Sequence, residues 1–256
     1  MTNKNAWGKK GTIVAIMSGT KSDKLIPVLQ QIPSRLRKKV KEITLDFAGN
    51  MGLVAKKCFP NAVQVIDRFH VQQLASEALQ EIRIKHRWEA IEQDNQAIEE
   101  ARNNKTSYQP EVLSNGDTLK QLLARSRYLL YKSEYKWTLE QKERAYLLFE
   151  KYPEINKAYK LTQELVTIFN TTTDKLLAFT KLALWNDKVE KSGFKSFNTV
   201  SRTVIMHYPK ILNYFNNRST NASAESFNAK IKAFRSQFRG VSDINFFLFR
   251  LTKLFA

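Results

Sequence analysis

Residues 217–239 decide the fold, and they read NRSTNASAESFNAKIKAFRSQFR. Ser219, Thr220 and Asn221 are residue types that accept hydrogen bonds from the free N–H groups at the start of a helix. Gly240 is typical of the position just after a helix end. The stretch therefore predicts a helix that follows these polar residues and ends before Gly240.

The predicted helix has one apolar stripe and one polar face. At about 100° per residue, the stripe contains Ala224, Phe227, Ile231, Phe234 and Phe238. The polar face contains Glu225, Asn228, Lys232, Arg235 and Arg239. The pattern alone leaves two interpretations open. The face is a solvated surface with an ion pair, or it presents a metal-binding carboxylate beside side chains that contact phosphate.

Charge points to a polyanionic partner. The 256 residues include 42 Lys and Arg against 24 Asp and Glu, which gives a formal net charge of +18. Such an excess favours nucleic acid, with an anionic membrane surface as the lesser alternative. No apolar run approaches the roughly 18–20 residues that span a bilayer, so we expect no membrane-spanning segment. The single cysteine, Cys58, fits a small core residue better than a nucleophile.

The first 70 residues predict alternating strands and helices. Short apolar runs at 12–17, 43–46 and 62–66 indicate strands. Helical patterns at 22–31 and from Gly49 to Cys58 separate them. This order is typical of an α/β fold with parallel strands. Asp46 and Asp67 stand at two strand ends, where open α/β sheets place their sites.

The remaining chain is predicted to be helical. Helical patterns cover 71–103, 117–132, 138–151, 154–169 and 173–191, and Trp88, Trp137 and Trp185 fit helix–helix core positions. The apolar stretch Ile244–Phe255 predicts a buried closing helix. We therefore expect three parts: 1–70 with the strands, 71–208 as an all-helical block, and 209–256 with the Glu225 helix.

Metal-dependent chemistry on phosphodiesters needs carboxylates that converge from separate elements. Asp46 after a strand and Glu225 on a helix supply two such acids. Mg²⁺ prefers oxygen ligands and keeps several waters. The residues thus allow a magnesium site formed by segments that are far apart in the chain.

Four segments carry a resemblance to a known family: LDFAGNM at 45–51, VIDRFHV at 65–71, TNASAESFNAKIK at 220–232 and FRGVSDINFFLFRL at 238–251. Together they resemble the bacterial insertion-sequence DDE transposases, over nearly the whole chain. The resemblance implies a ribonuclease H-like core interrupted by an all-helical insertion, mainly helical overall. It also implies Asp46 and Glu225 as catalytic ligands of Mg²⁺ or Mn²⁺, with Asp67 and His70 beside the site.

The resemblance implies DNA transposition, with strand cleavage followed by transfer of the 3′-hydroxyl to target DNA. The partners would be transposon ends and target DNA, bound through Asn228, Lys232, Arg235 and Arg239. A homo-oligomer and a cytoplasmic, nucleoid-associated location would follow. The family's first catalytic Asp has no counterpart before Thr12, so we expect an N-terminally truncated, inactive or partial fragment.

Two other functions stay open. A non-catalytic, basic nucleic-acid-binding remnant would bind through charge alone and show steep salt dependence without a metal requirement. A ribonuclease H-like nuclease of another type would differ in its substrate.

Overall fold

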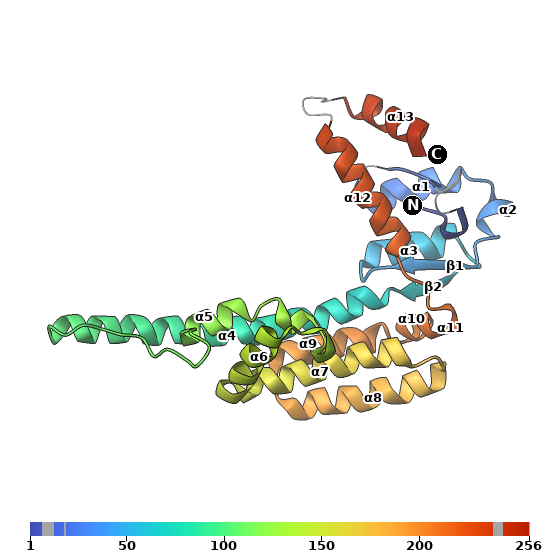
Figure 1. Cartoon of the computed structure of the whole chain (residues 1–256). Helices are drawn as coiled ribbons and strands as arrows, with labels where there is room; N and C mark the ends of the chain where they lie inside the picture. The colour runs from blue at the N-terminus through green and yellow to red at the C-terminus, as the bar shows by residue number, and fades with distance from the viewer. Residues whose placement is uncertain (7–12, 18, 238–242, 256) are drawn as a thin grey trace. The chain divides into compact units, whose positions relative to one another are not determined.

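The computed structural model describes residues 1–6, 13–17, 19–237 and 243–255. The chain divides into two compact units. The core unit comprises Met1–Arg68 and Pro209–Ala256, and the helical unit comprises Phe69–Tyr208. The chain is mostly helical, as the sequence predicts (Figure 1).

A two-stranded parallel sheet lies in the core unit. β1 (Glu42–Leu45) pairs with β2 (Val63–Ile66), and α3 (Gly49–Cys58) connects them. These two strands, the helix between them and the parallel pairing confirm the sequence prediction. The short α1 (Ser22–Gln30) and α2 (Ser34–Arg37) precede the sheet, and the 3-10 helix η1 (Lys4–Ala6) lies near the N-terminus.

The strand predicted at 12–17 is wrong for the described residues 13–17. Ile13 makes only an isolated antiparallel bridge with Thr2, and Val14 donates its backbone N–H to Met1 O at 3.0 Å. The β-branched run has strand propensity, but propensity yields a strand only where a partner edge is available. Here residues 13–14 contact residues 1–2 and do not pair with the sheet. Thr12 lies outside the described residues.

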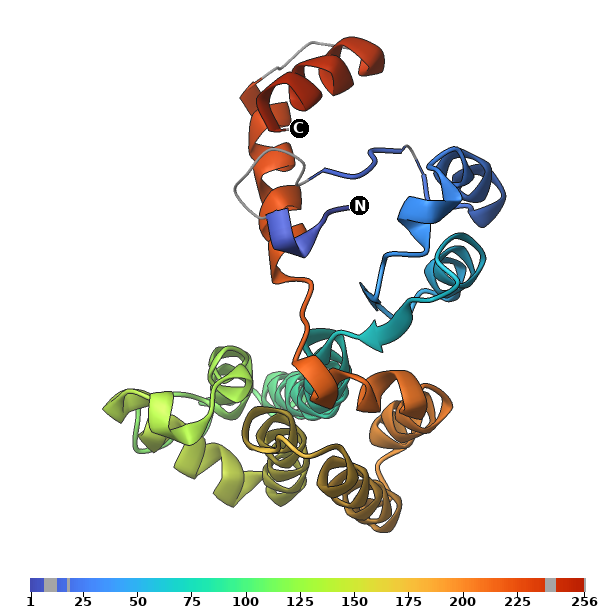
Figure 2. The ribbon, with the colours of Figure 1, turned by 90° about the vertical axis from the view of Figure 1, so that its right-hand side faces the viewer.

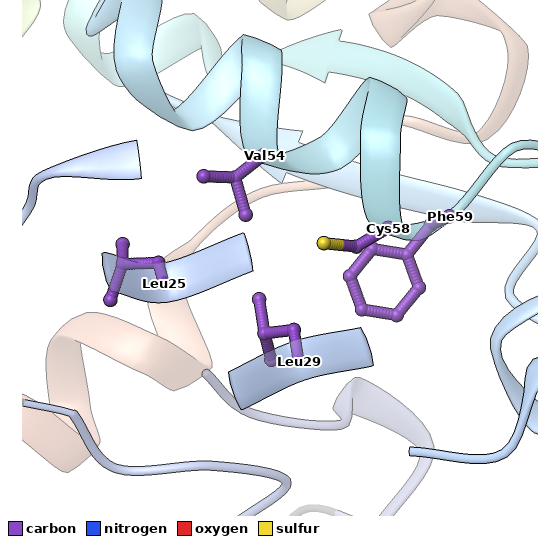
Figure 3. Close-up of a cluster of buried hydrophobic side chains, with 5 residues drawn as sticks. All are labelled: Leu25, Leu29, Val54, Cys58 and Phe59. Carbon is purple, nitrogen blue, oxygen red and sulfur yellow. The ribbon is translucent and has the colours of Figure 1, made fainter. Parts of the chain in front are cut away.

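Packing of α1 on α3 forms a small apolar cluster in the core unit. Leu25, Leu29, Val54, Cys58 and Phe59 are buried together in it (Figure 3). Cys58 is fully buried, as expected for a core residue, and burial raises the pKa of its thiol. A buried thiol with a raised pKa is a poor nucleophile at neutral pH.

The C-terminal part of the core unit is helical. It contains α10 (Tyr208–Leu212), α11 (Tyr214–Asn217), α12 (Ala222–Gln237) and α13 (Ile244–Phe255). The helix predicted after Asn221 is thus confirmed through Gln237, whereas Phe238, Arg239 and Gly240 lie outside the described residues. Helix α13 is also confirmed. Its expected burial is wrong at Phe246 and Phe249, which are exposed.

The helical unit is a group of packed helices. Its members are α4 (Arg68–Asn103), α5 (Leu119–Arg125), α6 (Leu139–Lys151), α7 (Pro153–Thr171), α8 (Lys175–Ser192) and α9 (Lys195–Met206), with the 3-10 turns η2 (Leu129–Tyr131) and η3 (Glu134–Lys136). α7 packs against α6 and α8, and α8 packs against α9. In Figure 2 several of these helices are seen nearly end-on.

Most helices of this unit match the sequence patterns. The single helix predicted at 117–132 is instead α5 followed by η2, and α9 was not predicted. Trp185 is fully buried and Trp137 partly so. Trp88 is 63% exposed, so its predicted core position is wrong. Ala90, two residues further along α4, is buried, so Trp88 lies on the helix face turned away from the packed one.

Residues 35–41, RLRKKVK, are rich in basic side chains, and one of these, Arg37, has a structural role that can be tested. Arg37 donates from Nε to Ile32 O at 2.9 Å and from Nη1 to Cys58 O at 2.7 Å. Arg37→Ala leaves both carbonyls without these bonds and should destabilise the protein by about 1–3 kcal/mol. Urea denaturation of Arg37→Ala and of the exposed control Arg35→Ala measures this. Equal unfolding midpoints for the two variants would contradict the assignment.

Candidate active site at the carboxyl edge of the sheet

The parallel register brings two acidic residues to the same edge of the sheet. Leu45 pairs with Ile66, so Asp46 and Asp67 each follow the last residue of a paired strand. Asp67 N also donates to Leu45 O at 3.0 Å. The expected position of both acids at the carboxyl ends of adjacent strands is confirmed.

Asp46 is an exposed residue in the turn between β1 and α3. One oxygen, Oδ1, accepts a hydrogen bond from Ala48 N at 2.9 Å. This bond is the usual means by which Asp stabilises a turn two residues further on. This bond uses Oδ1, so Oδ2 of Asp46 can still bind a metal ion as a monodentate ligand.

Asp67 is only 2% exposed, and it joins two distant segments of the chain. Its Oδ2 accepts a hydrogen bond from Asn221 N at 2.5 Å. A carboxylate this deeply buried costs free energy unless it is hydrogen-bonded. The bond to Asn221, 154 residues further along the chain, therefore fixes where the segment before α12 meets the end of β2.

Glu225 lies in the first turn of α12 and is exposed. Its backbone N–H donates to Asn221 O at 2.9 Å. Asn221 thus bonds to Asp67 through its N–H and to Glu225 through its carbonyl, which ties the helix start to the strand end. A carboxylate in the first turn of a helix is also favoured by the helix dipole.

Two asparagines add to the same connection. Asn213 Nδ2 donates to Gln64 O in β2 at 3.0 Å, and Asn217 Nδ2 donates to Glu42 Oε2 in β1 at 3.0 Å. The segment from α10 to α12 is therefore bound to both strands of the sheet. Patterns in the sequence gave no sign of these contacts.

Lys4 is a further residue that the sequence interpretation missed. Its Nζ donates to Thr44 Oγ1 at 2.5 Å and lies 3.8 Å from Glu42 Oε1. Partial burial lowers the pKa of this lysine, while the negative charges of Glu42 and Asp67 act to raise it. A cation from residues 1–6 therefore lies along β1, near the strand-end acids.

The polar face of α12 is solvent-exposed at the described positions. Asn228, Lys232 and Arg235 are exposed, and Arg239 lies outside the described residues. On the opposite side, Ala224, Phe227, Ile231 and Phe234 are half-buried, and the Phe234 ring packs 5.7 Å from the Phe247 ring of α13. The two-sided pattern of the helix is confirmed up to Gln237.

His70 belongs to the helical unit, whereas Asp46, Asp67 and Glu225 belong to the core unit. It lies in the first turn of α4, half-buried, with its ring 5.6 Å from that of Phe69 in an edge-on arrangement. A role beside the site stays a prediction.

The donor chemistry of Asp46 and Glu225 suits a hard cation. Mg²⁺ is often held by one or two carboxylates, with waters and substrate phosphates as its remaining ligands. Within residues 1–6, 13–17, 19–237 and 243–255, no three His, Cys, Asp or Glu side chains gather into a metal-binding group. The two predicted acids therefore fit the ion by ligand type, and the protein part of the site is at most a pair of carboxylates in the described chain.

Positive charge is concentrated in the core unit. This unit contains 21 of the 42 Lys and Arg but only 6 of the 24 Asp and Glu. The helical unit contains the other 21 basic residues together with 18 acidic ones. A count of charges in each predicted part of the sequence would have found this asymmetry.

Comparison with known proteins identifies the family. The sequence profile of the ISL3 transposases matches residues 1–251, so the chain belongs to this transposase family. The family match establishes an insertion-sequence transposase and implies that the protein acts on DNA. Comparison with curated proteins and with solved structures gave no match. In the described part of the chain, no helix is long and apolar enough to cross a membrane.

Removal of the Asp67–Asn221 hydrogen bond should reduce the protection of nearby backbone amides from hydrogen exchange. Asp67→Ala leaves the Asn221 N–H without its acceptor, so amide exchange at residues 221–225 should accelerate, with a loss of about 1–3 kcal/mol of stability. Asp67→Asn keeps an acceptor oxygen and should fall between this variant and the wild type. Hydrogen-exchange mass spectrometry measures the effect, with Asp46→Ala as the exposed control. Unchanged exchange at 221–225 in Asp67→Ala would refute it.

Proposed function

We propose that the protein takes part in metal-dependent DNA strand cleavage and in transfer of the freed 3′-hydroxyl to target DNA. The observation that carries this proposal is the hydrogen bond from Asn221 N to Asp67 Oδ2. It anchors the start of the Glu225 helix at the sheet edge that Asp46 occupies. Membership in a transposase family supports the same reaction at the level of the whole family.

Each residue then has a defined role. Asp46 and Glu225 hold Mg²⁺ or Mn²⁺ through carboxylate oxygens, and Asp67 positions the helix that bears Glu225. When bound, the ion polarises the phosphodiester and favours deprotonation of the attacking water or hydroxyl.

The polar face of α12 contacts the DNA backbone. Lys232, Arg235 and Arg239 neutralise phosphates, and Asn228 donates hydrogen bonds to them. The exposure of the described members of this set and the positive charge of the core unit support the role. These contacts position the DNA and carry no base specificity.

The chain is also proposed to have the architecture of the resembling family. Residues 1–70 and 209–256 form a ribonuclease H-like core, and residues 71–208 are an all-helical insertion between its two acids. The division of the chain near residues 68 and 209 supports it. The protein would work in the cytoplasm at the nucleoid, on transposon ends and target DNA, as a homo-oligomer that brings two DNA ends together.

A second candidate function is DNA binding without catalysis. It is favoured by the net positive charge of the core unit, which has 21 basic and 6 acidic residues. A protein of this kind binds DNA through phosphate neutralisation, with affinity that falls steeply as salt increases.

Substitution of the two acids separates these functions. Asp46→Asn and Glu225→Gln keep side-chain shape but remove the charges that bind the ion. Each should lower Mn²⁺-dependent cleavage of DNA carrying the element's terminal sequence by about a hundredfold or more. Affinity for the same DNA without metal should stay within about twofold, since phosphate contacts set it.

The matched control is Asp23→Asn, which changes an exposed acid on α1. Cleavage is read on gels and affinity by fluorescence anisotropy. A wild-type protein that binds this DNA but shows no metal-dependent cleavage would establish the second candidate. Full cleavage by either variant would remove that acid from the site.

A further inference from the structure

Residues 125–136 of the helical unit, RSRYLLYKSEYK, display three tyrosines among basic side chains. Tyr128, Tyr131 and Tyr135 are 69%, 49% and 80% exposed. Leu129 and Leu130 between them are buried and anchor the segment. Exposed apolar side chains that gather in one place mark interaction sites more often than scattered ones do.

The backbone of this segment is held in place by side chains from the surrounding helices. Three of its carbonyls accept hydrogen bonds: Arg127 O from Gln80 Nε2 (3.1 Å), Leu129 O from Trp137 Nε1 (2.9 Å) and Lys132 O from Tyr159 OH (2.9 Å). The tyrosines therefore project from a fixed backbone. A surface ordered in advance loses less conformational entropy on binding.

Cations lie against two of the rings. The Arg127 guanidinium is 5.4 Å from the centre of the Tyr128 ring, and Lys136 Nζ is 5.4 Å from the centre of the Tyr135 ring. Each ring nevertheless remains mostly accessible. An aromatic surface beside a cation is suited to a flat, electron-rich group linked to negative charge.

An arginine cluster adjoins the segment. Arg83 is buried and donates to Gln80 Oε1 at 2.6 Å and to Leu123 O at 2.8 Å. Burial, followed by the positive charges of Arg127 and Arg87, lowers its pKa. Within residues 19–237, Arg83, Arg87 and Arg127 form no ion pair with a carboxylate, and the buried Arg87 Nε has no hydrogen-bond partner. The cluster therefore concentrates positive charge that an anionic ligand can neutralise.

We propose that residues 125–136, with Arg87, form a binding surface for single-stranded DNA. Tyr128, Tyr131 and Tyr135 stack on unpaired bases, and Arg87 and Arg127 contact the adjoining phosphates. Stacking requires access to the face of a base, which paired and stacked DNA withholds. Duplex DNA can therefore interact with this surface only through its phosphates. The inference rests on the proposed function in that it adds a second DNA contact to the same protein.

The test compares affinity for labelled single-stranded oligo-dT with affinity for a duplex of equal length, by fluorescence anisotropy on the full chain. The variant Tyr128→Ala/Tyr135→Ala should bind oligo-dT about fivefold or more weakly for each ring removed. Its duplex affinity should not change. Tyr128→Phe/Tyr135→Phe keeps both rings and should bind oligo-dT as the wild type does.

Tyr146→Ala on α6 is the matched control, because Tyr146 is 70% exposed and lies outside the segment. It should bind both DNAs normally. Equal losses for oligo-dT and duplex in the double alanine variant, or no loss for either, would overturn the proposal. Asp46→Asn and Glu225→Gln should leave oligo-dT binding intact, so failure of this inference and failure of the proposed cleavage give different results.

Discussion

The hydrogen bond between Asn221 N and the buried Asp67 carboxylate is the constraint on which the candidate site depends. A buried carboxylate requires donors, and here one donor is a backbone N–H at the start of α12. Asn221 then bonds through its carbonyl to Glu225 N. Asn221 thereby connects Asp67 to Glu225, although these two acids are far apart in the sequence. The side chains of Asn213 and Asn217 attach the segment before α12 to both strands.

Local patterns in the sequence predict much of the fold. The periodicity of residues 224–235 predicts the two faces of α12, and the runs at 43–46 and 62–66 predict the paired strands. The strand at 12–17 fails because strand formation depends on an available edge, which propensity cannot reveal. The prediction for Trp88 fails because Trp88 lies about 200° around α4 from the buried Ala90, on the face turned away from the packed one.

The candidate site is predictable from sequence only in part. Asp46 is predictable because it stands at a strand end, and the family resemblance indicates both Asp46 and Glu225. Both are carboxylates, which are ligands that a hard cation prefers. The positioning role of Asp67 depends on a backbone contact across 154 residues, and single-sequence patterns contain no information on such contacts. Lys4 is missed for the same reason. Its bonds to Thr44 and Glu42 depend on how residues 1–6 lie along β1.

The two units use positive charge differently. The core unit carries a large excess of basic residues, which suits binding along a DNA backbone whatever its sequence. The helical unit is almost balanced in charge, but Arg83, Arg87 and Arg127 lie close enough together for the charges of Arg87 and Arg127 to lower the pKa of Arg83. Charge over a whole unit gives affinity and long-range attraction. A small cluster of arginines beside aromatic rings can instead discriminate between single-stranded and duplex DNA.

We propose that Asp46 and Glu225 bind one divalent ion together. Cleavage of the protein backbone by Fe²⁺ with ascorbate and peroxide tests it most directly, because radicals form at the bound ion and cut the nearest chain segments. Cuts are expected near residue 46 and near residue 225. Both should be suppressed by excess Mg²⁺ and both should be lost in either Asp46→Asn or Glu225→Gln. Cuts near only one of these residues, or loss of one cut without the other, would contradict it.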